Sequence, residues 1–214
     1  MRTVQQLRLF DMARFVATRL DFEIAKHVMR RVPPLTKCDP ARLLNLGCGD
    51  RPIAGWVNAD LPKLSFQAQP NWMLDATCSW KCPADTFGGV FTEHTLEHVS
   101  YESADFALRE CYRTMKNGAW IRIVTPDIRK YVALYSNPGN GQFSQFSSPA
   151  QAISNTTQNY GHRSVWDAPL FIDMLSRIGF RNALEVSFGE GADRRLIQDS
   201  PDRQWESLYV EAQK

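Results

Sequence analysis

The feature that most constrains the fold is a short, largely apolar run that ends in a glycine turn. Leu43 to Leu46 is followed directly by Gly47-Cys48-Gly49. An apolar run of this length next to a breaker is typical of a buried strand in a parallel sheet. Glycine lets the backbone approach a ligand closely and adopt torsion angles that other residues avoid. The sequence therefore predicts an α/β fold with a ligand site just after its first strand.

Acidic residues follow the next two strand candidates. Trp56 to Leu61 contains Asp60 near its end, and Asn71 to Ala76 contains Asp75. A strand, a glycine turn and an acid at the tip of the following strand are the means by which an α/β sheet holds a nucleoside. Asp50 follows the second glycine and the third glycine of a dinucleotide fingerprint is missing, so a diphosphate is disfavoured. A ligand without phosphate and with some positive charge fits better.

Three stretches together resemble class I S-adenosyl-L-methionine (SAM)-dependent methyltransferases. They are Leu44-Asn45-Leu46-Gly47-Cys48-Gly49, Gly55-Trp56-Val57-Asn58-Ala59-Asp60 and Glu93-His94-Thr95-Leu96-Glu97-His98. The similarity is closest to a small bacterial methyltransferase-domain subgroup. It continues through Glu110 to Gly118, Arg122 to Asp127 and Gly161 to Arg163, and it covers about residues 41–180.

This resemblance implies an enzyme with a Rossmann-like class I methyltransferase fold. Its sheet would be mostly parallel and seven-stranded, with a C-terminal antiparallel strand pair and helices on both faces. The implied cofactor is SAM. The residues expected to bind it are Asn45, Gly47, Cys48, Gly49, Asp60, Leu61, Asp75, Ala76 and Glu93. Asp75 matches the position that accepts a hydrogen bond from the adenine amine, although an aspartate there is also common in turns.

Methyl transfer from a sulfonium is a direct displacement, so the enzyme mainly holds the reacting atoms in line. A hydroxyl or ammonium acceptor must also lose a proton, and histidine suits that task because its ordinary pKa is about 6.5. His162 is the favoured base, whereas His94 and Glu93 are expected at the methionine end of the cofactor. Either histidine could instead be structural. The expected substrate-binding residues are Arg163, Tyr131 and Asp127.

The stretch from His94 to His98 also has the H-x-x-E-H spacing of one class of zinc peptidases. That chemistry requires the pattern within a helix and a third ligand downstream, whereas here a strand candidate precedes it directly. We therefore expect no metal. A zinc hydrolase using His94, Glu97 and His98 and a non-catalytic SAM-binding module remain as alternatives, and Asp50 argues against a nicotinamide-dependent oxidoreductase.

The 214 residues fit one methyltransferase domain. Residues 1–35 are expected to form a helical extension, in which a basic amphipathic helix from Val4 to Arg31 lies on a membrane, caps the site or packs on the sheet. Residues 136–160 lose apolar periodicity and predict a lid loop, with a short helix from Pro149 to Asn155, or an insertion without function. Residues 189–203 predict an exposed loop with a solvated charge run.

Composition limits the partners. A formal net charge of +2 gives no reason to expect nucleic acid, and the five cysteines suit a reducing compartment. No stretch has the roughly 20 apolar residues that span a bilayer, so we expect a cytoplasmic protein. The expected partner is a small-molecule methyl acceptor, and the resemblance leans toward a saccharide or secondary metabolite. The oligomeric state is not indicated. Basic residues near the expected mouth favour an acidic or phosphorylated acceptor: Arg51, Arg122, Arg129, Lys130 and Arg163.

Overall fold

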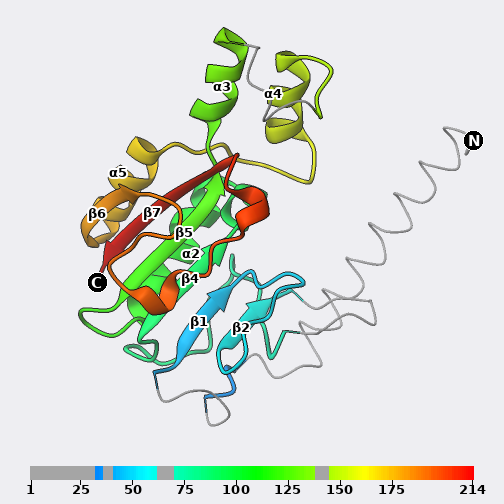
Figure 1. Ribbon diagram of the computed structural model, residues 1–214. Coiled ribbons are helices and arrows are strands. Elements are labelled where there is room, and N and C mark those ends of the chain that lie inside the picture. Colours follow the sequence, from blue (N-terminus) through cyan, green and yellow to red (C-terminus); the bar gives the residue numbers. More distant parts are fainter. Residues whose placement is uncertain (1–31, 36–40, 62–69, 138–144) are drawn as a thin grey trace, which may run out of the picture.

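A single twisted sheet organises the protein (Figure 1). The computed structural model describes residues 32–35, 41–61, 70–137 and 145–214. Within them the sheet has seven strands in the order β3-β2-β1-β4-β5-β7-β6. The strands are β1 (Leu43–Leu46), β2 (Val57–Asp60), β3 (Trp72–Met73), β4 (Gly89–Glu93), β5 (Trp120–Pro126), β6 (Arg181–Val186) and β7 (Ser207–Gln213).

The direction of the strands confirms the predicted fold class. β3, β2, β1, β4 and β5 pair in parallel, whereas β7 pairs antiparallel with both β5 and β6. The chain runs outward from β1 to β3 and then crosses to β4 on the other side of β1. The strand order therefore reverses at β1, and open α/β sheets bind ligands beyond the carboxyl ends of the strands at such a switch point.

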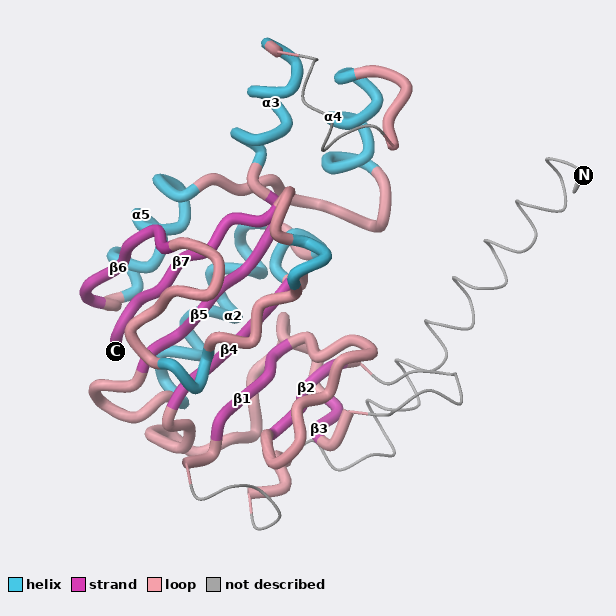
Figure 2. Tube along the Cα trace, viewed as in Figure 1, coloured by secondary structure: helices cyan, strands magenta, loops and turns pink. Residues whose placement is uncertain are grey.

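One face of the sheet is covered by α2 (Tyr101–Thr114) and α5 (Ala168–Ile178), which lie behind the strands in Figure 2. Leu108 of α2 and Phe171 of α5 are buried in one cluster with Leu44 of β1. These contacts follow from the helical spacing of apolar residues on each helix.

The residues at the two ends of α5 are typical of the start and the end of a helix. The Asp167 carboxylate accepts a hydrogen bond from the Leu170 amide at 3.0 Å, which caps the first turn. Gly179 ends the helix in the left-handed conformation, with φ of 117°.

The opposite face is covered by the segment between β6 and β7. This segment contains two 3₁₀-helices, η3 (Arg194–Leu196) and η4 (Pro201–Arg203). Leu196 is fully buried against Leu43 and Phe91. The prediction of an exposed loop with a solvated charge run over residues 189–203 is therefore only partly right, because most of these residues are exposed but Leu196 and Ser200 are buried.

A buried arginine holds this segment in place. Arg122 is 0% exposed, and its Nε atom donates to Asp199 Oδ1 at 2.6 Å while Nη1 donates to Glu211 Oε1 at 2.7 Å. Arg122 lies between two core residues of β5, and alternate residues of a strand point to opposite faces. The expectation that Arg122 lies at the mouth of the site is therefore wrong.

Two helices stand beyond the carboxyl end of β5 (Figure 1). They are α3 (Ile128–Ser136) and α4 (Pro149–Gln158), which pack together through Tyr131, Leu134 and Ala152. The short helix expected from Pro149 is confirmed and extends further than predicted. The prediction of a loop over residues 136–160 is only partly right, because α4 occupies ten of these residues. The function of this region as a lid stays a prediction.

The predicted amphipathic helix from Val4 to Arg31 lies outside the described residues. In the part of the chain that the structure describes, no helix has both the length and the apolar character required to cross a membrane.

Replacing Asp199 with asparagine will leave the charge of Arg122 only partly compensated inside the protein. Loss of one partner of a buried ion pair costs about 3–5 kcal/mol, so we expect a fall of that order in the free energy of unfolding. Urea denaturation measures it. Glu185→Gln is the matched control, because Glu185 pairs with Arg129 on the surface, where such pairs contribute about 0–1 kcal/mol. Equal effects of the two substitutions would contradict the assignment.

Candidate functional site

A cavity of about 590 Å³ opens beyond the carboxyl ends of β1 and β4. Its volume lies within the range of about 300–1,000 Å³ that is typical of small-molecule pockets. Six of the expected cofactor-binding and catalytic residues line it: Asn45, Gly47, Cys48, Gly49, Glu93 and His94. The structure therefore brings the glycine turn and the end of β4 together around one space.

The two glycines of the turn have different tasks. Both adopt positive φ angles, 72° at Gly47 and 51° at Gly49. A Cβ atom at Gly47 would lie 2.0 Å from the Thr95 hydroxyl oxygen, whereas one at Gly49 would meet nothing within 4 Å. Gly47 thus allows close packing of the turn against the chain after β4, and Gly49 leaves open space beside the backbone.

Asp60 is tied directly to the glycine turn. Its Oδ2 atom accepts a hydrogen bond from the Gly49 amide at 2.7 Å, and its Oδ1 atom accepts one from the Leu61 amide at 2.7 Å. Asp60 and Leu61 do not themselves line the cavity. The carboxylate nevertheless lies at the tip of β2, next to Gly49, where the sequence predicts a ribose contact.

Asp75 and Ala76 lie in a turn after β3. The Asp75 Oδ1 atom accepts hydrogen bonds from the Thr77 amide at 2.9 Å and the Thr77 hydroxyl at 2.7 Å. The Ala76 carbonyl accepts one from the Trp80 indole at 3.2 Å. These are the contacts of a turn aspartate, and neither residue lines the cavity. A contact of Asp75 with adenine stays a prediction.

A pair of buried asparagines, one of which lines the cavity, lies at its edge. Asn45 donates to the Asn58 side chain at 3.0 Å and to the Arg51 carbonyl at 3.1 Å. Asn58 in turn accepts from the Ile53 amide at 2.7 Å. The pair fixes the short link between β1 and β2. Asn58 was not predicted as a site residue, although an asparagine inside an apolar strand was a usable signal.

Glu93 joins the sheet to the segment after β6. Its Oε1 atom accepts a hydrogen bond from the Ser200 amide at 2.8 Å, and the Ser200 hydroxyl donates to Oε2. Arg51 lies 3.7 Å from the same carboxylate. Gln198 and Arg203 from this segment complete the wall of the cavity. Neither residue was predicted as part of the site, because the segment was expected to be a loop away from it.

His94 occupies a constrained position at the end of β4. Its φ angle of 48° is uncommon for a residue other than glycine, and such conformations cluster at functional sites. The side chain is 7% exposed, with Nδ1 at 3.3 Å from Glu97 Oε1. Its Nε2 atom lies 2.9 Å from the Ser207 hydroxyl. His94 is therefore oriented from both ring nitrogens at the edge of the cavity.

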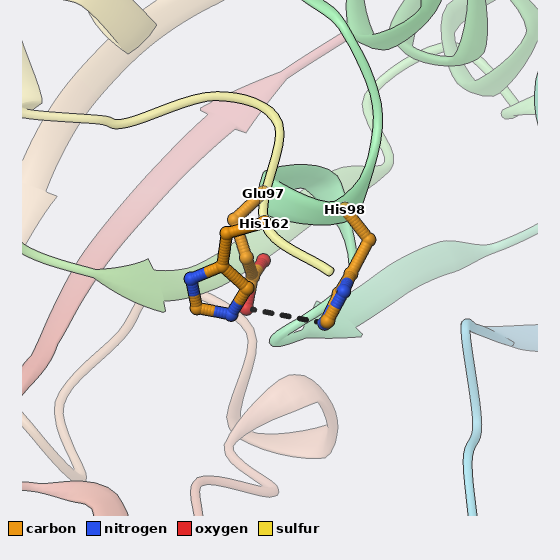
Figure 3. Close-up of side chains that lie close together, drawn as sticks. All are labelled: Glu97, His98 and His162. Atoms are coloured by element: carbon orange, nitrogen blue, oxygen red, sulfur yellow. Dashed lines mark ion pairs between the residues drawn. The ribbon is translucent and has the colours of Figure 1, made fainter. Parts of the chain in front are cut away.

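His162 lies near Glu97 and His98 instead of in the cavity wall (Figure 3). Its Nδ1 atom is 2.7 Å from the Thr156 carbonyl of α4, which can only accept, so Nδ1 carries the proton. Burial raises the pKa of the Glu97 carboxyl, but His94 and His98 lower it by more, and the net direction is downward. Burial lowers the pKa of His98.

The three residues expected to bind substrate also lie outside the cavity wall. The Tyr131 hydroxyl donates to Glu206 at 2.5 Å, and burial together with this carboxylate raises its pKa. Asp127 caps α3 and pairs with Arg129 at 2.8 Å. Arg163 is exposed, and its amide donates to the Glu97 carbonyl at 2.7 Å. Their roles in substrate binding stay predictions.

The strand order, the antiparallel terminal pair and the glycine turn at the switch point define the fold of class I SAM-dependent methyltransferases. Among solved structures, the chain is similar to a SAM-dependent methyltransferase from Archaeoglobus fulgidus, with a TM-score of 0.52 and 17% identity over 92% of this chain and 94% of that one. It is also similar to the SAM-dependent methyltransferase SibL in its apo form, with a TM-score of 0.50 and 14% identity over 97% of this chain and 58% of that one. No family profile and no curated protein matches the sequence. At these identities the likeness establishes the fold.

Replacing Gly47 with alanine will place a methyl group against Thr95 and strain the positive φ angle. Overpacking costs about 1–3 kcal/mol, so we expect at least that loss in the free energy of unfolding. Gly49→Ala is the control, because it carries the backbone strain without the clash and costs about 1 kcal/mol. Chemical denaturation compares the two. Adding Thr95→Gly should recover part of the Gly47→Ala loss, and no recovery would contradict the proposed clash.

Proposed function

We propose that this protein is a SAM-dependent methyltransferase that transfers a methyl group to an oxygen or nitrogen atom of a small molecule. The observation that carries the proposal is the cavity between the glycine turn and the end of β4, at the switch point of a class I methyltransferase sheet. The cavity combines an open glycine, acidic side chains and a histidine. These are the features that a nucleoside with a positively charged sulfur requires.

The residues around the cavity fit SAM better than a phosphorylated nucleotide. The backbone at Gly49 faces open space, so a ligand can lie against it. Asp60 is fixed on the Gly49 amide, and the oxygens of a carboxylate have further lone pairs for ribose hydroxyls. Asp50 also lines the cavity and favours a cationic group over a phosphate.

When bound, SAM supplies a methyl group on a sulfonium whose sulfur leaves as a neutral thioether. The task of the protein is then to align the acceptor and to take its proton. His94 is the better placed base, because it lines the cavity and His162 does not. His94 Nδ1 faces the Glu97 carboxylate at 3.3 Å, so we assign Nε2 as the atom that receives the proton of the acceptor, either directly or through the Ser207 hydroxyl.

The charges near the cavity give limited support for an acidic acceptor. Arg51 and Arg203 line the cavity. Arg129 is paired with Asp127 and Glu185, and Lys130 donates to the carbonyls of Gln204 and Ser207. We therefore propose an acceptor with at most one or two anionic groups, and a saccharide or secondary metabolite remains the expected chemical class.

Replacing Asp60 with alanine should weaken SAM binding by about 1–3 kcal/mol, because a charged hydrogen-bond acceptor is lost. Calorimetric titration with SAM and with S-adenosylhomocysteine measures the change. Asp173→Asn is the control, since Asp173 forms an exposed ion pair with Arg177 on α5. Absence of SAM binding to the unmodified protein would refute the proposal, and an unchanged dissociation constant in Asp60→Ala would refute the role of Asp60.

Replacing His94 with glutamine should lower kcat by about 10²–10⁴-fold, the usual contribution of a general base, while SAM binding stays nearly constant. The measurement is S-adenosylhomocysteine release over a panel of hydroxyl and amine acceptors, including sugars and phosphorylated compounds. A loss confined to His162→Gln would identify His162 as the base instead. SAM binding without turnover on any acceptor would favour a non-catalytic binding module.

A further inference from the structure

We propose that Glu97, His98 and His162 form a binding site for a zinc-class divalent cation. One ligand atom from each residue lies within 4.8 Å of the other two. His98 Nε2 is 4.0 Å from Glu97 Oε1, and Figure 3 shows both imidazole rings approaching this carboxylate. Tetrahedral zinc with bonds of about 2.0–2.1 Å places its ligand atoms about 3.3 Å apart. Small side-chain movements would therefore complete the site.

Glu97 supplies an independent observation that points to a ligand. The residue is 1% exposed, yet its Oε1 atom has no hydrogen-bond partner in the part of the chain that the structure describes. The His94 ring nitrogen at 3.3 Å is an ion-pair contact that does not meet hydrogen-bond geometry. A buried carboxylate oxygen without a hydrogen bond is costly. A cation at this point would satisfy it.

The other contacts of the three side chains orient them as metal ligands. His162 Nδ1 donates to the Thr156 carbonyl, which leaves the lone pair of Nε2 available. Metal-binding histidines almost always have such a second contact. The other carboxylate oxygen of Glu97 accepts from the Thr125 hydroxyl at 3.3 Å. Both Arg163 and Ser164 donate backbone hydrogen bonds to the Glu97 carbonyl, so the two ligand-bearing segments are already joined.

The ligand set indicates the kind of cation. Two imidazoles and one carboxylate suit zinc and neighbouring transition metals, whereas magnesium and calcium prefer oxygen ligands. Three protein ligands also leave a fourth position for water or another oxygen, as in catalytic zinc sites. The His98 side chain is 41% exposed, so this position can be reached from solvent.

This site differs from the zinc-peptidase pattern found in the sequence. That pattern requires His94 and His98 on one helical face, but His94 ends β4 with a positive φ angle and contacts Ser207. His98 instead lies in η1 (Leu96–His98), beside His162. His162 follows α4, so a bound cation would fasten the end of this helix to the edge of the sheet. The proposal does not depend on methyltransferase activity.

The test is a titration of the full-length protein, freed of metal with a chelator, with Co²⁺ and with Zn²⁺. Loss of a group that supports a metal ligand already costs about 10–100-fold in affinity, so His98→Ala and His162→Ala should each weaken binding by more than about 100-fold. Cobalt should give visible absorption bands without a thiolate charge-transfer band. Zinc should raise the temperature of unfolding of the unmodified protein and not of these variants.

Cys78→Ser is the control, because Cys78 is exposed and thiolates are common ligands of both metals. This variant should bind as tightly as the unmodified protein. Glu97→Gln is a third variant, which removes the carboxylate and keeps the size of the side chain. Circular dichroism will establish that each variant is folded before its affinity is compared. Unchanged affinity in both histidine variants, a thiolate band with cobalt, or loss of binding in Cys78→Ser would each overturn the proposal. SAM is absent throughout, so the result is separate from the test of methyltransferase function.

Discussion

The buried ion pair of Arg122 is the interaction on which the rest of the site depends. Arg122 points to the face of the sheet opposite α2 and α5, where it binds Asp199 and Glu211. Asp199 is followed directly by Ser200, whose amide and hydroxyl hold the Glu93 carboxylate at the cavity. A guanidinium is expensive to bury unless it is fully paired. The segment that supplies Asp199 must therefore close over the sheet, and the cavity wall forms as a consequence.

The carboxyl-terminal part of the chain thus supplies part of the wall of a site whose other residues come from β1, β4 and the turns that follow them. Gln198 and Arg203 line the same cavity as the glycine turn. Ser207, the first residue of β7, orients the His94 ring. In this protein the link between β1 and β2 is a short turn fixed by asparagines. The segment before β7 covers the face of the sheet, and it also brings polar groups to the place where a ligand is expected.

Local patterns in the sequence were sufficient for the fold and for the glycine half of the site. The apolar run before Gly47 and the capped helix from Ala168 to Ile178 both follow from interactions between near neighbours, so they could be predicted. The contact of Arg122 with Asp199 joins residues 77 positions apart, and no local pattern records it. Polarity alone suggested solvent exposure for residues 189–203. In the sequence, a charged residue that is buried in an ion pair cannot be distinguished from an exposed one until its partner is known.

The histidines show how one backbone angle separates two chemistries. A helix through residues 94–98 would place His94 and His98 on one face, as the H-x-x-E-H spacing implies. The positive φ angle of His94 ends β4 instead and turns its ring toward Ser207 and the cavity. The His98 ring contacts the His162 ring instead. Glu97 contacts both His94 and His98. One carboxylate therefore orients the proposed base and completes the proposed cation site.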